Sequence, residues 1–329
     1  MITEELRNLA LTACILVVCF RNVRFTATAI AGQTSGTVSH DAIQRALSRQ
    51  GAEWSRKVWK KVKRSILPKI QNGYFIIDDT VICKEDTSWN TEMTSKLWCS
   101  SEKRYRYGQN VVLLIWTDGK TRHPIDLRFW VKGGGKTKLT LALDMLRVAK
   151  QRCGVGNRPK AVLFDSWYAA AELLLGIRSL GWDWICKIKR NRTLDGDIQV
   201  QHRWKTTYAS CLTILNGGIK AQVIKDKDHF FATSLLHWKP DAIKKAYRKR
   251  WWIEEVIKVL KSELGFQTCQ ARSIDPIRAH AFICLMCFNE LEKERCRRKK
   301  STIGQVRSTL FNQPIPLNRA SILNENVLA

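Results

Sequence analysis

The chain has 329 residues, and its 56 Lys and Arg side chains against 29 Asp and Glu give a formal net charge of +27. Because polyanions are the commonest partners of such strongly cationic proteins, the composition indicates nucleic acid as the partner class. With 45% hydrophobic residues, the chain has a globular composition, which excludes wholesale disorder and collagen-like repeats. Its 11 cysteines form no disulfide framework, which favours a reducing, cytoplasmic compartment.

Residues 1–70 show helical patterns, and we expect them to form an N-terminal DNA-binding region. The first helix is predicted at Glu4–Phe20. Its apolar part, Leu9–Phe20, is about half as long as a membrane span and follows no positively charged segment, so we interpret it as a buried helix and not as a signal peptide. Two more helices are predicted at Ser39–Gln50, with the first residue as N-cap, and at Glu53–Leu67.

The third helix combines aromatic and cationic side chains. Trp54 and Trp59 stand among lysines and arginines, a composition that can bind DNA phosphates by charge alone. A solvated basic face that packs through the same tryptophans is the open alternative, and only the charge of the whole chain favours DNA. The candidate phosphate-binding side chains are Lys57, Lys60, Lys61 and Arg64.

From residue 73 the pattern changes to alternating strands and helices. Asp118-Gly119 stands between two apolar runs and predicts a tight hairpin turn. The order of elements predicts an α/β protein with a mixed sheet. The predicted elements are strands at 73–80, 109–117 and 123–131, a helix at 137–152, a strand at 161–165, a helix at 168–180 and a strand at 182–190.

The rest of the chain divides by composition. Residues 191–238 contain short β-like pieces separated by turns, which predict a β-rich inserted subdomain. Pro240 is suited to the first turn of a long helix that ends near Leu264. We therefore expect a catalytic core at 71–270, followed by a helical, basic C-terminal region at 271–329.

Three acidic residues fall where this architecture would bring them together. Asp79 ends the first strand, Asp165 ends the strand after the first core helix, and Glu254 lies on the long helix. Carboxylates at the ends of neighbouring strands, with a third from a helix across them, can hold two Mg²⁺ ions for phosphodiester cleavage. The adjacent Asp78 is the open alternative to Asp79 as the first ligand.

The long helix carries a polar stripe around its glutamate. Tyr247, Arg250, Glu254 and Lys261 fall within an arc of about 60°, because each residue advances the helix by about 100°. Glu255 lies outside this arc. The stripe places one carboxylate between two cations and a phenol, which favours an active site over a solvated face.

These residues resemble the DDE transposases of insertion sequences, and more narrowly the cut-and-paste group of insertion sequence family four and its relatives. The resemblance covers about residues 70–290. The family's first aspartate precedes Thr, as Asp79 does in FIIDDT, and its second opens a helix after an apolar strand, as Asp165 does in VLFDSWY. The group's signature, Tyr-x2-Arg-x3-Glu-x6-Lys, is complete here in Tyr247, Arg250, Glu254 and Lys261.

The resemblance implies an RNase H-like, retroviral-integrase-like core that cuts double-stranded DNA at the terminal inverted repeats of a mobile element. The freed 3′-hydroxyls are then transferred to target DNA. Two Mg²⁺ ions are implied as cofactors, with Mn²⁺ as a substitute, and Asp79, Asp165 and Glu254 as their ligands. A homodimer that holds two DNA ends, a prokaryotic nucleoid-associated location in the cytoplasm and no membrane are also implied.

The family pattern also implies roles for other side chains. Tyr247, Arg250 and Lys261 would contact phosphates near the scissile bond. A tryptophan of the β-rich insertion can stack on a flipped base in this group, and Trp204 and Trp238 are the candidates here. Whether a hairpin forms at the cut DNA end stays open.

Two other functions remain open at this stage. One is an RNase H-like DNA nuclease or resolvase that cuts without strand transfer. The other is a catalytically decayed copy that only binds DNA. The complete helix signature and the presence of all three acids favour the transposase.

Overall fold

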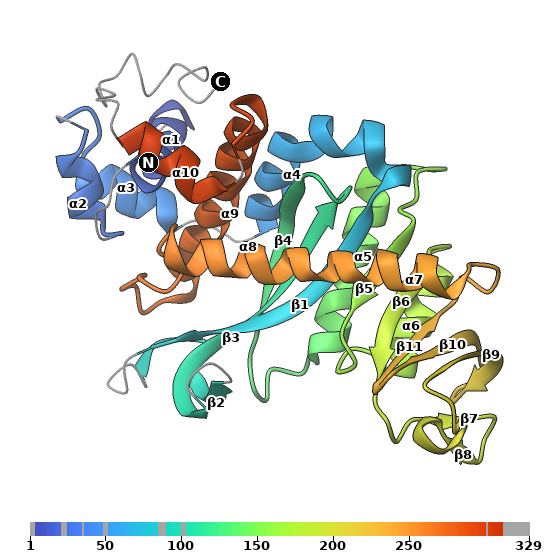
Figure 1. Cartoon of the computed structure of the whole chain (residues 1–329). Helices are drawn as coiled ribbons and strands as arrows, with labels where there is room; N and C mark the ends of the chain where they lie inside the picture. Colours follow the sequence, from blue (N-terminus) through green and yellow to red (C-terminus); the bar gives the residue numbers. More distant parts are fainter. Residues whose placement is uncertain are drawn as a thin grey trace.

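A twisted mixed sheet crosses the molecule and carries helices on both faces (Figure 1). The computed structural model describes residues 4–20, 25–34, 36–48, 52–84, 90–99, 103–300 and 302–311. The strands are β1 (Tyr74–Cys83), β2 (Ser95–Cys99), β3 (Arg104–Thr117), β4 (Arg122–Trp130), β5 (Ala161–Phe164), β6 (Trp184–Ile188), β7 (Thr193–Leu194), β8 (Ile198–Gln199), β9 (Tyr208–Leu215), β10 (Ile219–Asp226) and β11 (His229–Thr233). The helices are α1 (Glu4–Phe20), α2 (Ala27–Gly32), α3 (His40–Leu47), α4 (Ala52–Ile66), α5 (Lys138–Cys153), α6 (Ala171–Ser179), α7 (Pro240–Tyr247), α8 (Trp251–Ser262), α9 (Ile274–Arg297) and α10 (Ile303–Phe311).

The strand order is β2-β3-β1-β5-β6-β11-β10-β9-β7-β8, and β4 pairs with β3 as well. β1 pairs with β5, and β5 with β6, in parallel, whereas the other pairings among the described strands are antiparallel. The first four residues of β1 and all four residues of β5 are apolar and buried. Such continuous apolar runs are typical of parallel strands that are covered on both faces.

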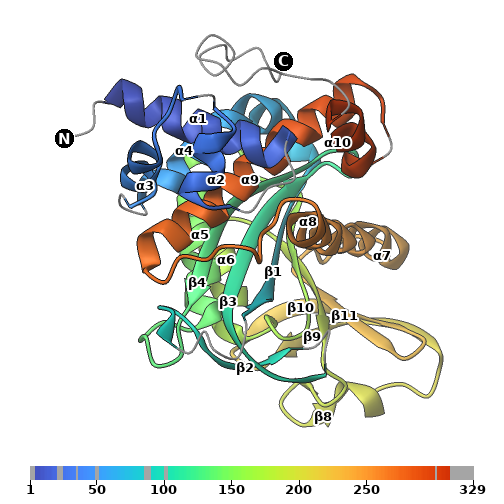
Figure 2. The same ribbon diagram turned by 90° about the vertical axis from the view of Figure 1, so that its left-hand side faces the viewer.

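Two buried clusters lie on opposite faces of the sheet. One cluster joins α5 and α6 to the sheet and to the strands of the insertion. The other joins α1, α2, α3, α8, α9 and α10 to the opposite face, and α4 contributes to both clusters. Figure 2 shows the N-terminal helices and α9 gathered at one end of the sheet, with the insertion strands toward the other end. None of the described helices has the length and apolarity needed to cross a membrane.

Local signals that the sequence predicted are confirmed at several element ends. The Ser39 side chain accepts a hydrogen bond from the backbone N–H of Ala42 at 3.2 Å, and Pro240 occupies the first turn of α7. In the turn between β3 and β4, the Asp118 carboxylate accepts hydrogen bonds from the backbone N–H groups of Lys120 and Thr121, while Gly119 takes a φ of +90°. Glycine suits this left-handed backbone because it has no Cβ.

The structure adds to or differs from the sequence prediction in three places. The strands of the predicted β-rich insertion continue the central sheet, because β11 pairs with β6. The predicted long helix is divided by a 3₁₀ turn at Arg248–Arg250 into α7 and α8, which still run in one direction (Figure 1). The strand β2 and helix α2 were not predicted.

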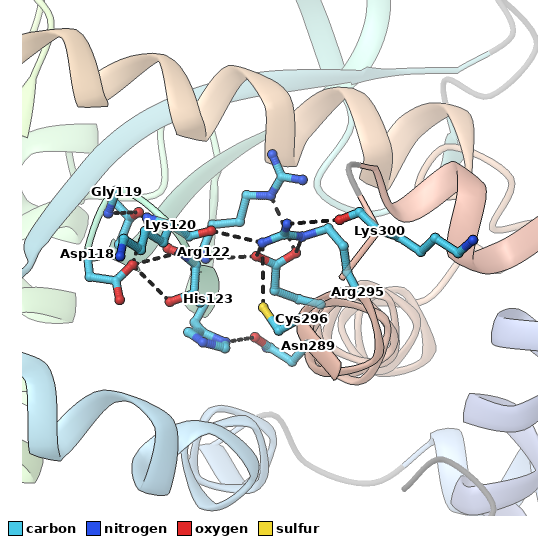
Figure 3. A network of polar contacts seen from close by, with 12 residues as sticks. Asp118, Gly119, Lys120, Arg122, His123, Asn289, Arg295, Cys296 and Lys300 are labelled. Atoms are coloured by element: carbon cyan, nitrogen blue, oxygen red, sulfur yellow. Dashed lines mark hydrogen bonds and ion pairs between the residues drawn. The ribbon is translucent and has the colours of Figure 1, made fainter. Parts of the chain in front are cut away.

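A buried polar network fixes α9 against the β3–β4 hairpin (Figure 3). The fully buried Glu292 carboxylate accepts from the backbone N–H of Arg122 at 3.1 Å and from Nε of Arg295 at 2.7 Å. Arg295 also donates to the carbonyl oxygen of Lys120 at 2.9 Å. One turn earlier, Asn289 contacts the ring of His123, whose pKa is lowered by burial. α9 is therefore held by directional contacts as well as by apolar packing.

The Nε of the buried Arg122 side chain lies 3.6 Å from the Oε2 of Glu292. We expect Glu292→Gln to lower the free energy of unfolding by roughly 3–5 kcal/mol, because it leaves this buried guanidinium without an opposing charge. Asp241→Asn is the control, since this carboxylate is 94% exposed in its pair with Lys244 and should cost less than about 1 kcal/mol. Urea unfolding of both variants measures the difference. Equal stability of the two variants would contradict the role given to Glu292.

Candidate active site

Asp78 and Asp165 lie at the same level of two neighbouring parallel strands. β1 and β5 pair with Ile76 opposite Leu163, and continuing this register by two residues places Asp78 opposite Asp165. Neighbouring strands lie about 4.8 Å apart, so the two carboxylates start from adjacent backbone positions. The second aspartate of the DD pair, Asp79, is one residue out of this register.

Strand alternation decides which face each carboxylate occupies. Ile76 and Leu163 belong to the buried cluster under α8, whereas Ile77 belongs to the cluster under α5 and α6. Successive side chains of a strand point to opposite faces. Asp78 and Asp165 therefore face α8, and Asp79 faces the opposite side of the sheet.

Arg250 joins Asp78 to Glu254. Its Nη1 lies 2.8 Å from the Oδ2 of Asp78, and its Nη2 donates to the Oε1 of Glu254 one turn along the helix. The apolar side of α8 is buried against the sheet through Ile253 and Val256, which holds this polar stripe over β1. The helix thus brings Glu254 to the face that carries Asp78 and Asp165.

Burial and like charge act on the carboxylate cluster. Burial, and then the negative charge of Asp165, raise the pKa of Asp78 to about 7, although Arg250 lowers it in part. The buried Tyr247 hydroxyl finds no hydrogen-bond partner among the described residues, and burial raises its pKa as well. A positively charged ligand would relieve the repulsion between the two carboxylates.

Asp79 has a different environment. Its Oδ2 accepts from the Nζ of Lys138 at 2.6 Å and from the amide of Asn110 at 2.8 Å, and its Oδ1 accepts from the Tyr168 hydroxyl at 3.0 Å. Three donors therefore occupy this carboxylate on the α5 side of the sheet. The geometry favours Asp78 over Asp79 as the partner of Asp165 and Glu254.

The turn after β5 orients Asp165 and exposes a tryptophan. The Oδ1 of Asp165 accepts from the backbone N–H groups of Trp167 at 2.9 Å and Tyr168 at 3.3 Å. The Trp167 side chain is 48% exposed, and the ammonium of Lys138 lies 4.9 Å from its ring centroid. Trp167 lines a cavity of about 290 Å³, together with Arg192.

The remaining predicted side chains lie away from the carboxylates. Lys261, near the end of α8, is half-buried and donates to the carbonyl oxygen of Val81 at 2.8 Å, and burial lowers its pKa. Trp204 packs on the α6 side of the core and Trp238 on the α8 side. Neither tryptophan lines the cavity beside Asp165.

The cationic side chains of α4 differ in how exposed they are to a DNA partner. Lys61 pairs with Glu290 on α9 at 2.8 Å, and the ammonium of Lys57 lies 5.6 Å from the Trp54 ring centroid. Lys60 and Arg64 are exposed. The interpretation of this helix as a DNA-binding surface is therefore carried best by Lys60 and Arg64.

Asp78 and Asp165 fit a hard cation, since both are carboxylates at adjacent strands and the pKa of Asp78 is raised by burial and then by the charge of Asp165. The Glu254 carboxylate does not converge with these two aspartates into one ligand set. Among the residues described, no three Asp, Glu, His or Cys side chains converge into a ligand set. The physical reason is Arg250, whose guanidinium stands between Asp78 and Glu254.

Comparison with known families decides the class of protein. The family described as the transposase DDE domain matches residues 73–289, about two thirds of the chain. The chain belongs to this transposase family. The matched range begins at β1 and ends within α9, so it contains every carboxylate of the cluster.

A solved transposase has a similar fold. A cryo-EM structure of the piggyBac transposase synaptic complex with hairpin DNA matches with a TM-score of 0.57 and 10% sequence identity. The match covers 100% of this chain and 75% of that chain. At this identity the likeness concerns the mixed α/β fold alone. A search of curated proteins finds no match.

The sequence patterns did not identify two side chains that lie at the candidate site, Lys138 and Trp167. Lys138 follows a glycine-rich stretch, and its link to Asp79 is visible only in the folded chain. Trp167 stands two residues after Asp165, and an aromatic residue beside a candidate catalytic aspartate was the available signal.

The pKa of Asp78 gives a pH dependence for metal binding. Below about pH 7 this carboxyl holds a proton that a divalent cation must displace, so Mn²⁺ affinity should fall by up to about tenfold per pH unit. Above that pH the affinity should level off. Calorimetric titration of Mn²⁺ between about pH 5.5 and 8.5 measures it. Affinity that does not change with pH over this range would contradict a role for Asp78.

Proposed function

We propose that this transposase cuts DNA at the ends of a mobile element and transfers the freed 3′-hydroxyls to target DNA. The observation that carries the proposal is the register of β1 and β5, which puts Asp78 opposite Asp165 on the face covered by Glu254. The segment from α7 through α8 carries seven Lys and Arg side chains against three Asp and Glu. Carboxylates beneath such a cationic segment are suited to cutting a polyanion. The formal charge of +27 supports DNA as the substrate.

An RNase H-like core is part of this proposal. The strands β4, β3 and β1 form an antiparallel unit, and β5 and β6 continue it in parallel from β1. Helices α5 and α6 connect the parallel strands and lie against one face. This order supports an RNase H-like core with an insertion between β6 and α7.

We assign the metal ligands to Asp78, Asp165 and Glu254, with Asp79 as the alternative first ligand. Bound Mg²⁺ or Mn²⁺ would supply a Lewis acid that activates water or a 3′-hydroxyl and stabilises the leaving oxygen. Arg250 contacts both Asp78 and Glu254 and so links these two carboxylates. Asp79 holds Lys138 and Tyr168 next to the turn that orients Asp165.

DNA would lie along α8 and reach other basic surfaces. Tyr247, Arg250 and Lys261 are proposed to contact phosphates near the scissile bond. The Tyr247 hydroxyl is unpaired among the described residues. The piggyBac structure contains hairpin DNA, which supports DNA as the partner here. A homodimer, a cytoplasmic location and strand transfer are proposed with it.

Trp167 is the tryptophan that we favour for stacking on a DNA base. Trp167 is exposed beside Asp165 and lines the adjacent cavity, so we favour it for contact with a base near the cut. Trp204 and Trp238 of the insertion remain the alternatives.

Conservative variants can distinguish the roles of the four carboxylates. We expect Asp78→Asn, Asp165→Asn and Glu254→Gln each to reduce metal-dependent DNA cutting at least about a thousandfold, with DNA binding retained. Asp79→Asn is the matched control and should lose no more than about tenfold, because its carboxylate positions other side chains and holds no metal. Gel assays with Mg²⁺ and Mn²⁺ measure cutting and joining.

Other results would select another function. Cutting without joining in every condition would favour a nuclease or resolvase, and end binding without cutting by the unaltered chain would favour a decayed copy. Loss of cutting in Asp79→Asn, with cutting retained in Asp78→Asn, would restore Asp79 as the ligand.

Lys258 is a matched control for Lys261, because both lie on α8. Lys258 is exposed, whereas Lys261 is half-buried and belongs to the polar stripe that also carries Arg250 and Glu254. We expect Lys261→Ala to weaken DNA binding and reduce the slope of log K against log salt by about 0.9, as loss of one phosphate contact requires. Lys258→Ala should leave the slope unchanged. Fluorescence anisotropy over a salt series is the measurement, and equal slopes for both variants would count against Lys261.

A further inference from the structure

A two-stranded ribbon projects from the sheet beyond β1. β3 pairs with β1 only from Gly108 onward, and its first residues pair instead with β2, from Cys99 opposite Arg104 to Ser95 opposite Gly108. Figure 1 shows this ribbon at the lower left, on the side toward which the C-terminal end of α8 points. The described ribbon comprises residues 95–99 and 103–108.

Two large aromatic side chains face solvent on one side of the ribbon. Trp98 and Tyr105 are directly opposite in the ladder, and their rings meet edge to face with centroids 5.4 Å apart. Trp98 is 53% exposed and Tyr105 is 63% exposed. Two neighbouring aromatic rings with this exposure form a contact surface and not a core.

The charged side chains of the described ribbon are all cationic. Lys96 is exposed on the strand that carries Trp98, two residues away and therefore on the same face. Lys103 and Arg104 are also exposed, beside Tyr105. The surface thus combines aromatic rings with positive charge, which matches the bases and phosphates of a nucleic acid.

The base of the ribbon is fixed to the core. Arg106 donates to the carbonyl oxygen of Lys84 at 3.2 Å, and the Lys84 N–H donates to the carbonyl oxygen of Tyr107 at 2.9 Å. The buried Lys84 ammonium donates in turn to the carbonyl oxygen of Cys269 at 2.8 Å. The thiols of Cys83 on β1 and Cys99 on β2 are 3.0 Å apart. The ribbon is therefore presented in a defined direction.

The ribbon lies within one turn of duplex DNA of the carboxylates. Asp78 pairs with Leu113, and Tyr105 stands eight positions before Leu113, or at most about 27 Å along β3. Lys261 lies between them, because it contacts Val81 on β1. One B-DNA turn is roughly 34 Å long, so a single duplex is long enough to contact both the carboxylate cluster and the ribbon.

We propose that the β2–β3 ribbon binds in the major groove of the duplex whose backbone contacts α8. The major groove is wide enough to admit a two-stranded β-ribbon. Trp98 and Tyr105 make apolar contacts with base edges, and Lys96 and Lys103 contact the flanking phosphates. This inference rests on the proposed function, because it takes double-stranded DNA as the substrate, but it adds a second contact outside the cutting site.

The test measures binding without cutting. The full chain, in EDTA, is titrated against a duplex of about 30 base pairs, long enough for about three turns, and fluorescence anisotropy gives the affinity. We expect the double variant Trp98→Ala, Tyr105→Ala to bind about tenfold more weakly with an unchanged salt slope, because no cation is lost. Tyr208→Ala is the control, since Tyr208 is 58% exposed on β9, away from this ribbon.

Two further measurements sharpen the test. Lys96→Gln should keep the fold and reduce the salt slope by about 0.9. Replacing thymine by uracil removes methyl groups from the major groove, and it should weaken binding of the unaltered chain more than binding of the double variant. Thermal unfolding of all variants should be unchanged, since both aromatic side chains are more than half exposed.

Three results would overturn parts of the proposal. Binding by the double variant within about twofold of the unaltered chain, or equal weakening by Tyr208→Ala, would overturn the ribbon as a DNA contact. Equal sensitivity of both proteins to uracil would overturn its place in the major groove. Ribbon-dependent binding by a chain that cuts no DNA with Mg²⁺ or Mn²⁺ would overturn the proposed function and leave this inference standing.

Discussion

The parallel pairing of β1 with β5 is the constraint on which the site depends. A strand side chain changes face with every residue, so a shift of one position would exchange Asp78 for Asp79 under α8. The observed register puts Asp78 opposite Asp165 and leaves Asp79 with Lys138 on the other face. Every later feature of the cluster, including the position of Arg250, follows from this pairing.

Local periodicity explains what could be predicted from the sequence. The stripe of Arg250, Glu254 and Lys261 depends only on the helical repeat of one segment, and the structure places Arg250 and Glu254 in contact on it. The sequence of β1 alone cannot show whether Asp78 or Asp79 faces α8. The residues before them are buried on both faces, so alternation is invisible in the sequence and only the pairing with β5 distinguishes the two.

Long-range pairing also explains the features that sequence patterns missed. The strands of the insertion were predicted as strands, but their continuation of the sheet depends on β11 meeting β6. The ribbon was missed for a local reason, because Ser95–Cys99 is a short strand whose aromatic side chain, Trp98, faces solvent. A pattern that seeks one buried face cannot identify a strand whose large apolar residue is exposed.

The contact between α1 and α9 has a consequence for how the chain is made. The buried residues of α1, from Ala10 to Val18, belong to the same cluster as α9, which begins at Ile274. A ribosome adds about 5–20 residues per second, so the apolar face of α1 waits on the order of 10 to 50 seconds before α9 is synthesised. During synthesis this first helix therefore depends on transient packing against α2 and α3, or on a chaperone, to stay out of aggregates.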